Sequence, residues 1–380
     1  MGDYVRQMPH QGSHDMARRP SAAMRFHIDV PLLLLLIALT VYGLFVLYSA
    51  SGQNMGAVVR QGRYFIVAYC IMILGAQISL QRYMRWAPWL YLMGIASLVA
   101  VMLVGVGAKG AQRWLEIGGF RFQPSEIMKL MVPMAVAWYL ADRTLPPRFN
   151  SVLIALVLVG IPAVLILQQP DLGTALLIAS SGLFVLFVAG IGWRYIFGAV
   201  ILAIASAWPA WMFVLKDYQK QRILTMLNPE TDKLGAGWNI IQSKTAIGSG
   251  GWSGKGWMKG TQSQLDFLPE SHTDFIIAVL AEEYGLRGIL MLMGIYLLIL
   301  LRGFWIGIRA QTSFGRMMAG SLTLTFFVYI FVNMGMVAGL LPVVGVPLPL
   351  VSAGGTSVVT LMAGFGVLMA VSTEKRMVAH

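Results

Sequence analysis

The chain has 380 residues, of which 57% are hydrophobic and only 12% are charged. A soluble domain carries about 25% charged residues, so this composition excludes a soluble enzyme and indicates a polytopic membrane protein. The net charge of +12 comes from basic residues spread over short segments between apolar runs. That distribution favours anchoring at a membrane surface and argues against a nucleic-acid partner. Cys70 is the single cysteine and the five histidines lack ligand spacing, so no disulfide framework and no metal site built from cysteines or paired histidines is expected.

Residues 1–25 are polar and aperiodic, which predicts a disordered cytoplasmic tail. Residues 26–377 follow as one transmembrane domain, and its first apolar run is long enough to cross the hydrocarbon core of a bilayer. The pattern of apolar runs predicts an all-α polytopic membrane protein with ten transmembrane helices. Their apolar cores lie near residues 31–50, 64–80, 87–107, 126–141, 151–168, 172–191, 195–215, 273–301, 317–341 and 355–372.

The basic residues predict the orientation of these helices. An even number of helices places both termini on one side. With both termini in the cytoplasm, every inner loop carries at least one arginine, as the positive-inside rule requires. Residues 216–272 then form a large extracytoplasmic loop between the seventh and eighth helices. Its stretch GSGGWSGKG resembles a phosphate-binding loop only loosely, because Ser249 and Gly256 stand where glycine and Ser or Thr are needed, so no nucleotide site is expected.

One pair of charged residues and one single carboxylate stand out at predicted helix starts. Glu126 and Lys129 are three residues apart and share a helix face, and Pro124 before them is typical of the first helical position. The pair either neutralises itself and holds the bundle together, or lines a polar cavity that opens outward. Asp171 follows a proline in QQPDLGT, where a carboxylate at a helix start is favourable in itself.

The stretch FLPESHTDFIIAVLAEEYG places four acids before or inside an apolar run. Ser271 and Asp274 have the spacing of a capping box, so Asp274 is either a helix cap or a catalytic carboxylate at the outer end of its helix. Glu283 and Arg287 are four apart and predict an intrahelical pair. Glu282 has no helical partner and therefore must face protein or water.

The stretch LLPVVGVPLPLVSAGGTS, residues 340–357, is interrupted by three prolines and three glycines. Irregular backbone of this kind cannot face lipid, so it predicts a re-entrant segment that lines a cavity; the alternative is an ordinary outer loop. All these groups, and Arg222 and Lys244 of the large loop, fall at the outer ends of the predicted helices. Together they predict one outward-facing cavity of mixed charge, which suits an anionic, sugar-bearing lipid.

Six motifs in order along the chain resemble the SEDS family (shape, elongation, division and sporulation), and its elongation branch more than its division branch. They are KGAQRW, FQPSEIMKL, QPDLGTALL, GWNIIQSKTAIGSGG, GKGWMKGTQSQLDFLPESHTDFI and PVVGVPLPLVSAGGTS. The resemblance implies a ten-helix peptidoglycan glycosyltransferase of the bacterial inner membrane that acts on lipid II. It also implies a class B penicillin-binding protein, the transpeptidase, and the wider elongation machinery as partners, in a membrane-lipid environment.

The resemblance assigns roles to individual residues. Asp274 matches the aspartate of the family's HTDF motif and is expected to be the general base. Five further residues match polar cavity positions: Arg113, Glu126, Lys129, Asp171 and Arg222. The basic ones are expected to stabilise the departing pyrophosphate, a role that a divalent cation such as Mg²⁺ or Mn²⁺ could share. A lipid II flippase is the main alternative, and a non-catalytic scaffold of the elongation machinery is a third.

Overall fold

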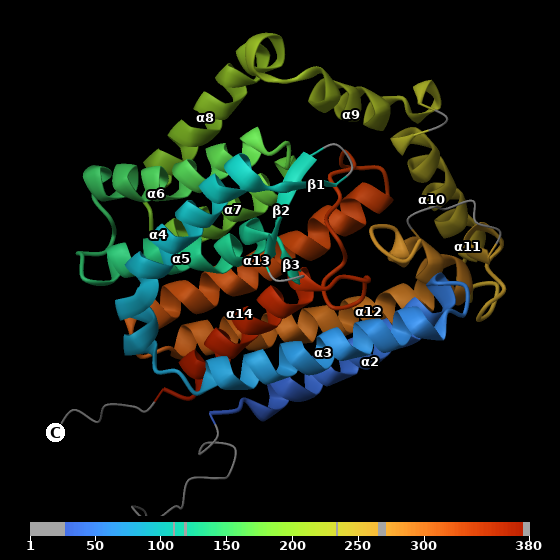
Figure 1. Ribbon diagram of the computed structural model, residues 1–380, viewed down its shortest axis with the longest axis horizontal. Helices are drawn as coiled ribbons and strands as arrows, with labels where there is room; N and C mark the ends of the chain where they lie inside the picture. The colour runs from blue at the N-terminus through green and yellow to red at the C-terminus, as the bar shows by residue number, and fades with distance from the viewer. Residues whose placement is uncertain (1–26, 109–110, 118–119, 233–234, 265–270, 375–380) are drawn as a thin grey trace, which may run out of the picture.

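The computed structural model describes residues 27–108, 111–117, 120–232, 235–264 and 271–374. The predicted tail, residues 1–25, lies outside the described part of the chain. Each of the ten predicted segments contains a helix, and Figure 1 shows most of them packed side by side in one bundle. These helices are α2 (Val30–Ala50), α3 (Met55–Ala76), α4 (Leu80–Val104), α5 (Pro124–Ala141), α6 (Phe149–Gln168), α7 (Leu172–Val188), α8 (Trp193–Pro209), α12 (Ile276–Arg309), α13 (Ser313–Val337) and α14 (Thr356–Ser372).

Within the described residues, seven helices are long and apolar enough to cross a membrane, and the helical membrane-protein class is thereby confirmed. They are α2, α3, α4, α6, α12, α13 and the helix formed by α8 with the π-turn η1 (Ala210–Val214). The apolar helices α7 and α14 are shorter.

Short polar residues begin several of these helices, as capping chemistry predicts. The carboxylate of Asp29 accepts a hydrogen bond from the Leu32 N–H at the start of α2, and Asp171 does the same for Thr174 at the start of α7. Asn54 and Thr312 cap α3 and α13 in the same way. Each cap satisfies an N–H that has no acceptor inside its own helix.

Helix α13 forms the centre of the bundle and packs against α5, α7, α12 and α14. Small residues allow the close approaches: a Cβ at Gly320 would lie 2.6 Å from Val188, and one at Gly366 would lie 2.6 Å from the Met72 carbonyl oxygen. Glycine contacts of this kind are common where membrane helices meet. Helix α8 differs, because none of its residues is buried.

Two regions contain structure that the apolar pattern did not predict. Three short antiparallel strands, β1 (Val106–Ala108), β2 (Ala111–Ile117) and β3 (Phe120–Phe122), form a small sheet between α4 and α5. The segment predicted as a large loop, residues 216–272, contains helices. They are α9 (Asp217–Leu227), the 3₁₀ turn η2 (Pro229–Thr231), α10 (Ala236–Gly250) and α11 (Thr261–Gln264).

The bundle has two distinct ends. At one, the two ends of the described chain lie close together, because the side chain of His27 hydrogen-bonds Thr373 at 3.0 Å. Helix α2 runs from there to Ala50, whose carbonyl accepts a hydrogen bond from Ser271 near the start of α12. We call these the terminal end and the site end.

Candidate active site

A segment without helix, residues 338–355, joins α13 to α14 at the site end. It enters the protein interior: Val346, Leu348 and Leu350 are almost fully buried. Tyr296 on α12 donates a hydrogen bond to the Pro349 carbonyl at 2.7 Å. The irregular backbone thus lies against protein, as the prolines and glycines predict.

Asp274 lies against this segment. Helix α12 begins at Ile276 with Phe275 as its N-cap, so Asp274 precedes the helix and the capping-box interpretation is wrong. Ser271, the expected partner in that box, donates to Ala50 instead. A Cβ at Gly345 would lie 3.6 Å from Asp274 Oδ2, which places the carboxylate beside a glycine of the 338–355 segment.

The backbone before α12 is held by donors that the sequence did not reveal. Asn333, fully buried on α13, donates from Nδ2 to the carbonyl oxygens of Asp274 at 2.9 Å and Val346 at 2.8 Å. Ser352 donates to the Thr273 carbonyl, and the Ala353 N–H donates to that of His272 at 3.0 Å. Three successive carbonyls are therefore fixed, and with them the position of the Asp274 side chain. The available signal was an asparagine whose neighbours in the sequence, residues 330–332 and 334–337, are all apolar or glycine.

Arg113 and Asp171 form the second part of the site. Arg113, on β2, lies 3.6 Å from the Asp171 carboxylate and donates to the carbonyls of Gln169 and Pro170. Gln123, the N-cap residue of α5, donates to the same carboxylate at 3.1 Å. The sheet therefore positions Arg113 next to the start of α7.

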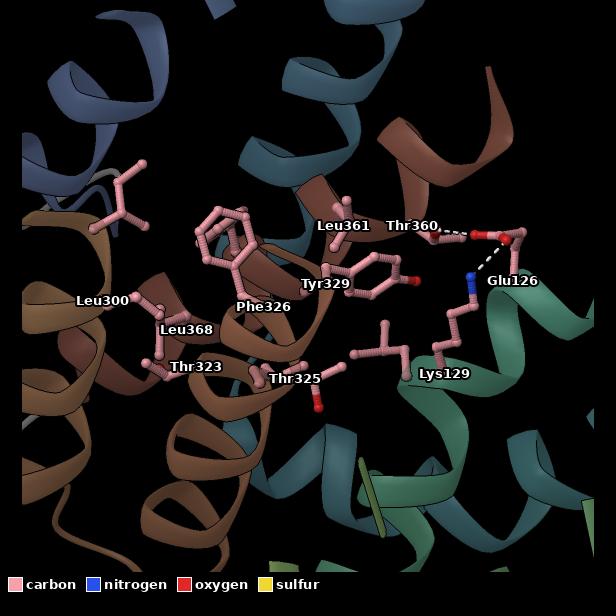
Figure 2. A pocket seen from close by; sticks show the side chains of 15 residues that line it. Glu126, Lys129, Leu300, Thr323, Thr325, Phe326, Tyr329, Thr360, Leu361 and Leu368 are labelled. Atoms are coloured by element: carbon pink, nitrogen blue, oxygen red, sulfur yellow. Dashed lines mark hydrogen bonds and ion pairs between the residues drawn. The ribbon is translucent and has the colours of Figure 1, made fainter. Parts of the chain in front are cut away.

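Glu126 and Lys129 form the third part. Helix α5 begins at Pro124 as predicted, and Lys129 Nζ lies 2.6 Å from Glu126 Oε1. Figure 2 shows Glu126 between Lys129 and Thr360, and Tyr329 pointing toward the lysine, whose ammonium lies 5.0 Å from the ring centre. Both charged side chains are buried, so each depends on the other for compensation.

A narrow pocket extends from this pair into the bundle. Its polar end is formed by Glu126, Lys129 and Thr360, and the rest is mainly apolar. The apolar lining includes Leu322 and Phe365. It also includes four residues labelled in Figure 2: Leu300, Phe326, Leu361 and Leu368.

The three parts surround the same segment. Tyr329 and Asn333 are one turn apart on α13, so the face that meets Lys129 also holds Asp274. On the other side, a Cβ at Gly173, two residues after Asp171, would lie 2.8 Å from the Val344 carbonyl oxygen. The structure therefore gathers Arg113, Glu126, Lys129, Asp171 and Asp274 around residues 338–355.

The two residues predicted from the large loop behave differently. Lys244 on α10 packs on the edge of the segment, since a Cβ at Gly339 would lie 2.3 Å from its Cε. Arg222 is not brought to the cluster. It lies on α9, which packs on α10 and η2, and its guanidinium lies 5.9 Å from the Tyr218 ring on the same helix. In Figure 1, α9 lies at the margin of the molecule.

The acids further along α12 also depart from expectation. The predicted helical pair of Glu283 and Arg287 assumed a continuous helix, but Gly285, between them, has φ 63° and ψ −156° and breaks it. Glu283 instead accepts a hydrogen bond from Ser49 at 2.5 Å. Ser49 lies at the site end of α2, so these acids lie near that end of the bundle.

Within the described ranges, no group of three or more His, Cys, Asp or Glu side chains is placed to hold a metal ion. The carboxylates at 126 and 171 each have a basic partner, which does not fit an all-protein metal site.

The family model for the cell cycle proteins FtsW, RodA and SpoVE matches residues 30–377, nearly the whole described chain. The chain belongs to the SEDS family. A relative from Escherichia coli K12, named peptidoglycan glycosyltransferase MrdB, is 55% identical and covers 93% of this chain and 96% of its own. A Geobacter metallireducens protein named probable peptidoglycan glycosyltransferase FtsW is 38% identical, covering 92% and 95%.

Solved structures support the same SEDS assignment. The Thermus thermophilus rod shape determining protein RodA matches with a TM-score of 0.69 at 27% identity, covering 90% of this chain and 96% of that one. A structure described as coordinating polymerization and crosslinking in a peptidoglycan synthase complex matches with a TM-score of 0.80 at 30% identity, covering 90% and 97%. The motif resemblance and the helical membrane-protein class are thereby confirmed. The count of ten transmembrane helices stays a prediction.

Proposed function

We propose that this protein is a peptidoglycan glycosyltransferase that polymerises lipid II into β-1,4-linked glycan strands, with Asp274 as general base. The observation that carries the proposal is the 55% identity, over 93% of this chain, to a SEDS protein named for that activity. The site geometry supports it independently, because a carboxylate with a fixed backbone lies at the same end of the bundle as buried and half-buried cations.

The chemistry is a substitution at the anomeric carbon. Asp274 takes the proton from the 4-hydroxyl of the acceptor's GlcNAc, and that oxygen attacks the anomeric carbon of the donor's MurNAc. The bond from this carbon to the pyrophosphate breaks with inversion, and undecaprenyl pyrophosphate leaves with the bonding electrons. Arg113 and Lys129 stabilise the charge that builds on the pyrophosphate. Lys244 at the rim and Arg222 on α9 are proposed to contact the substrate further out.

The pocket below Glu126 and Lys129 supports a lipid-linked substrate. It combines a charged end with an apolar lining, which matches a ligand with an anionic head and a hydrocarbon tail. We therefore place a pyrophosphate near the lysine and the first part of the polyprenyl chain among the leucines and phenylalanines.

Partner and location follow from the same relatives. The chain is an integral membrane protein, and we propose the bacterial inner membrane, with the terminal end in the cytoplasm and the site end outside. The synthase complex among the similar structures couples polymerisation to crosslinking. A class B penicillin-binding protein is accordingly the proposed transpeptidase partner, within the cell's elongation machinery.

The distribution of charge argues against a flippase. Such a protein needs polar groups along a path through the bilayer. Among the described residues, the buried charged side chains are Asp29 at the terminal end and Glu126, Lys129, Asp171, Glu282 and Glu283 toward the site end. They do not trace a path between the two ends.

Two assays on the purified full chain separate these functions. The first follows glycan formation from lipid II on a gel, with and without the transpeptidase. The second follows movement of lipid II across the bilayer of vesicles containing the protein. We expect glycan chains and no transport; transport without glycan formation would overturn the proposal.

A further inference from the structure

The break in α12 is filled by a different part of the chain. Gly285 interrupts the helix, which frees backbone groups on both sides of it. Residues 251–256, which follow α10, run through the gap and take up these groups. Four backbone hydrogen bonds join the two segments: Lys255 N–H to Glu282 O at 2.9 Å, Gly256 N–H to Glu283 O at 3.0 Å, Leu286 N–H to Gly251 O at 3.0 Å and Arg287 N–H to Trp252 O at 3.3 Å.

Glycines make this contact possible. A Cβ at Gly254 would lie 2.1 Å from the Glu283 carbonyl oxygen, and one at Gly285 would lie 2.5 Å from the Gly254 nitrogen. Both residues also have positive φ, which other residues rarely adopt. The stretch GSGGWSGKG, which resembles a phosphate loop without meeting its pattern, is therefore explained by passage across a broken helix.

The side chain of Glu282 fastens the same two segments together. It is fully buried, and its Oε1 accepts hydrogen bonds from Lys255 Nζ at 2.7 Å and Thr261 N–H at 2.8 Å. The Gln262 N–H donates to both carboxylate oxygens, at 3.1 and 3.2 Å. Lys255 Nζ also donates to Thr261 Oγ1 at 2.8 Å, which closes the cluster. We call Glu282 and Lys255 the clamp.

Glu282 lies on the short helix, residues 276–284, that begins two residues after Asp274. Gly285 breaks α12 into this short helix and the long transmembrane helix that follows it. Because of this break, the long helix does not set the orientation of the short one. Contacts at the two ends of this short helix fix it instead. Asn333 and the 338–355 segment hold the start, where Asp274 lies, and the clamp with residues 251–262 holds the other end.

We propose that the Glu282–Lys255 clamp positions Asp274 for glycan polymerisation by locking residues 251–262 onto the short helix 276–284. This inference rests on the proposed function and adds a residue pair to it. Glu282 acts through Asp274 and not on the substrate, because its carboxylate is enclosed by protein donors and has no exposed surface. A misplacement of about 1 Å at a reacting group can cost roughly 100-fold in rate, so a clamp far from the chemistry has a large effect.

The test uses lysine variants of the full chain in lipid nanodiscs. Lys255→Met removes the cation of the clamp, and Lys255→Arg retains it. Lys259→Met is the matched control, because Lys259 is exposed on the same segment. Glu282→Gln is the companion variant; should it fail to fold, the lysine set alone decides. The measurements are kcat and KM for lipid II, and hydrogen–deuterium exchange over residues 251–262 and 276–284.

We expect Lys255→Met to lower kcat by roughly 10- to 100-fold with KM changed less than about twofold. Exchange should rise in both segments, while Lys255→Arg and Lys259→Met stay near wild type. Wild-type kcat in Lys255→Met, or a loss of kcat without increased exchange, would overturn the clamp. An equal loss in Lys259→Met would do the same.

Failure of the proposed function gives a different pattern. In that case the wild-type chain makes no glycan, or Asp274→Asn polymerises as well as wild type. Hydrogen–deuterium exchange then tests the structural part of the clamp proposal by itself. Faster exchange of residues 276–284 in Lys255→Met supports the clamp, and unchanged exchange refutes it.

Discussion

The two ends of the bundle both bury charged side chains, but they do so in different surroundings. At the terminal end, Arg302 binds the Asp29 carboxylate through two nitrogens, at 3.1 and 2.8 Å, and Ser372 and the Leu32 N–H donate to it as well. This clip joins the regular helices α2, α12 and α14. At the site end, charged residues lie at helix starts and on a strand, around a segment without helix.

The comparison shows that burial alone does not mark a functional charge. Asp29 is 4% exposed and Asp171 is 8% exposed, yet the first serves to tie helices together and the second lies in the proposed site. The difference lies in the backbone that surrounds them, because irregular backbone inside a membrane protein is retained where it lines a site. Substitutions at the two ends should therefore separate activity from stability.

The largest effect is expected for Asp274→Asn at the site end. The amide cannot accept a proton, so polymerisation of lipid II should fall by about 10²- to 10⁴-fold. The melting temperature should stay close to wild type, because the Asp274 backbone carbonyl still receives the Asn333 hydrogen bond. Asp217→Asn, on the exposed start of α9, is the control and should retain full activity. Wild-type rates in purified Asp274→Asn would refute the base assignment.

A smaller effect on rate is expected for Asn333→Leu, which removes both donors to the carbonyls of Asp274 and Val346. Leaving these carbonyls without a partner should cost about 1–3 kcal/mol in unfolding free energy and lower kcat at least about tenfold.

Ser321→Ala provides the matched control on the same helix. It removes one buried hydrogen bond, from Ser321 to the Ser181 carbonyl, away from the site. It should reduce stability and leave kcat unchanged. Equal losses of kcat in the two variants would show that Asn333 acts only through general stability.

Local sequence pattern predicted the helices and part of the site well. Apolar runs located all ten helical segments, and spacing alone predicted the start of α5 at Pro124, the Glu126–Lys129 pair and Asp171 at the start of α7. These features share one property: the interacting residues are within a few positions of each other, so helical geometry relates them directly.

Contacts between distant segments could not be predicted in this way. Glu282 seemed to lack a partner because Lys255 lies 27 positions earlier, and Asn333 reaches Asp274 across 59 positions. Gly285 carried no visible sign that it would break α12. The strands of the small sheet are too short and too rich in glycine nearby to show alternation. The position of Asp274 before its helix was also hidden, since a cap and a catalytic carboxylate share the same spacing.

At the terminal end, Asp29→Asn should affect stability and not catalysis. Losing a charged partner of Arg302 should lower the unfolding free energy by about 1–3 kcal/mol, with the kcat of the folded protein unchanged. A double-mutant cycle with Arg302→Met measures the coupling between the two side chains. A loss of kcat in the folded variant would show that the two ends are coupled.

The same clip predicts an acid dependence. Burial would raise the pKa of Asp29, but hydrogen bonds from Arg302, Ser372 and Leu32 outweigh it and lower that pKa below its ordinary value of 3.8. An acid with a lowered pKa stabilises the fold above its unfolded pKa, and this contribution disappears as pH falls through the folded value. The contribution of Asp29 should therefore be constant near neutral pH and be lost only below 3.8, and Asp29→Asn should lack this loss.

The smallest effect is expected for Glu374→Gln, also at the terminal end. This substitution should stabilise the fold, whereas Asp29→Asn should destabilise it. Burial raises the pKa of Glu374 above its ordinary 4.5, and the hydrogen bond from Thr312 only partly opposes this. The charged form therefore destabilises the fold at neutral pH, and the cost is relieved as pH falls through the folded pKa toward the unfolded one. Glu374→Gln should stabilise the protein at pH 7 by about 0.5 kcal/mol or less. Melting curves should show this gain shrinking toward about pH 4, where wild-type Glu374 is itself protonated. A gain that grows on acidification would contradict the raised pKa and leave Asp29 as the only acid-sensitive contact described at this end.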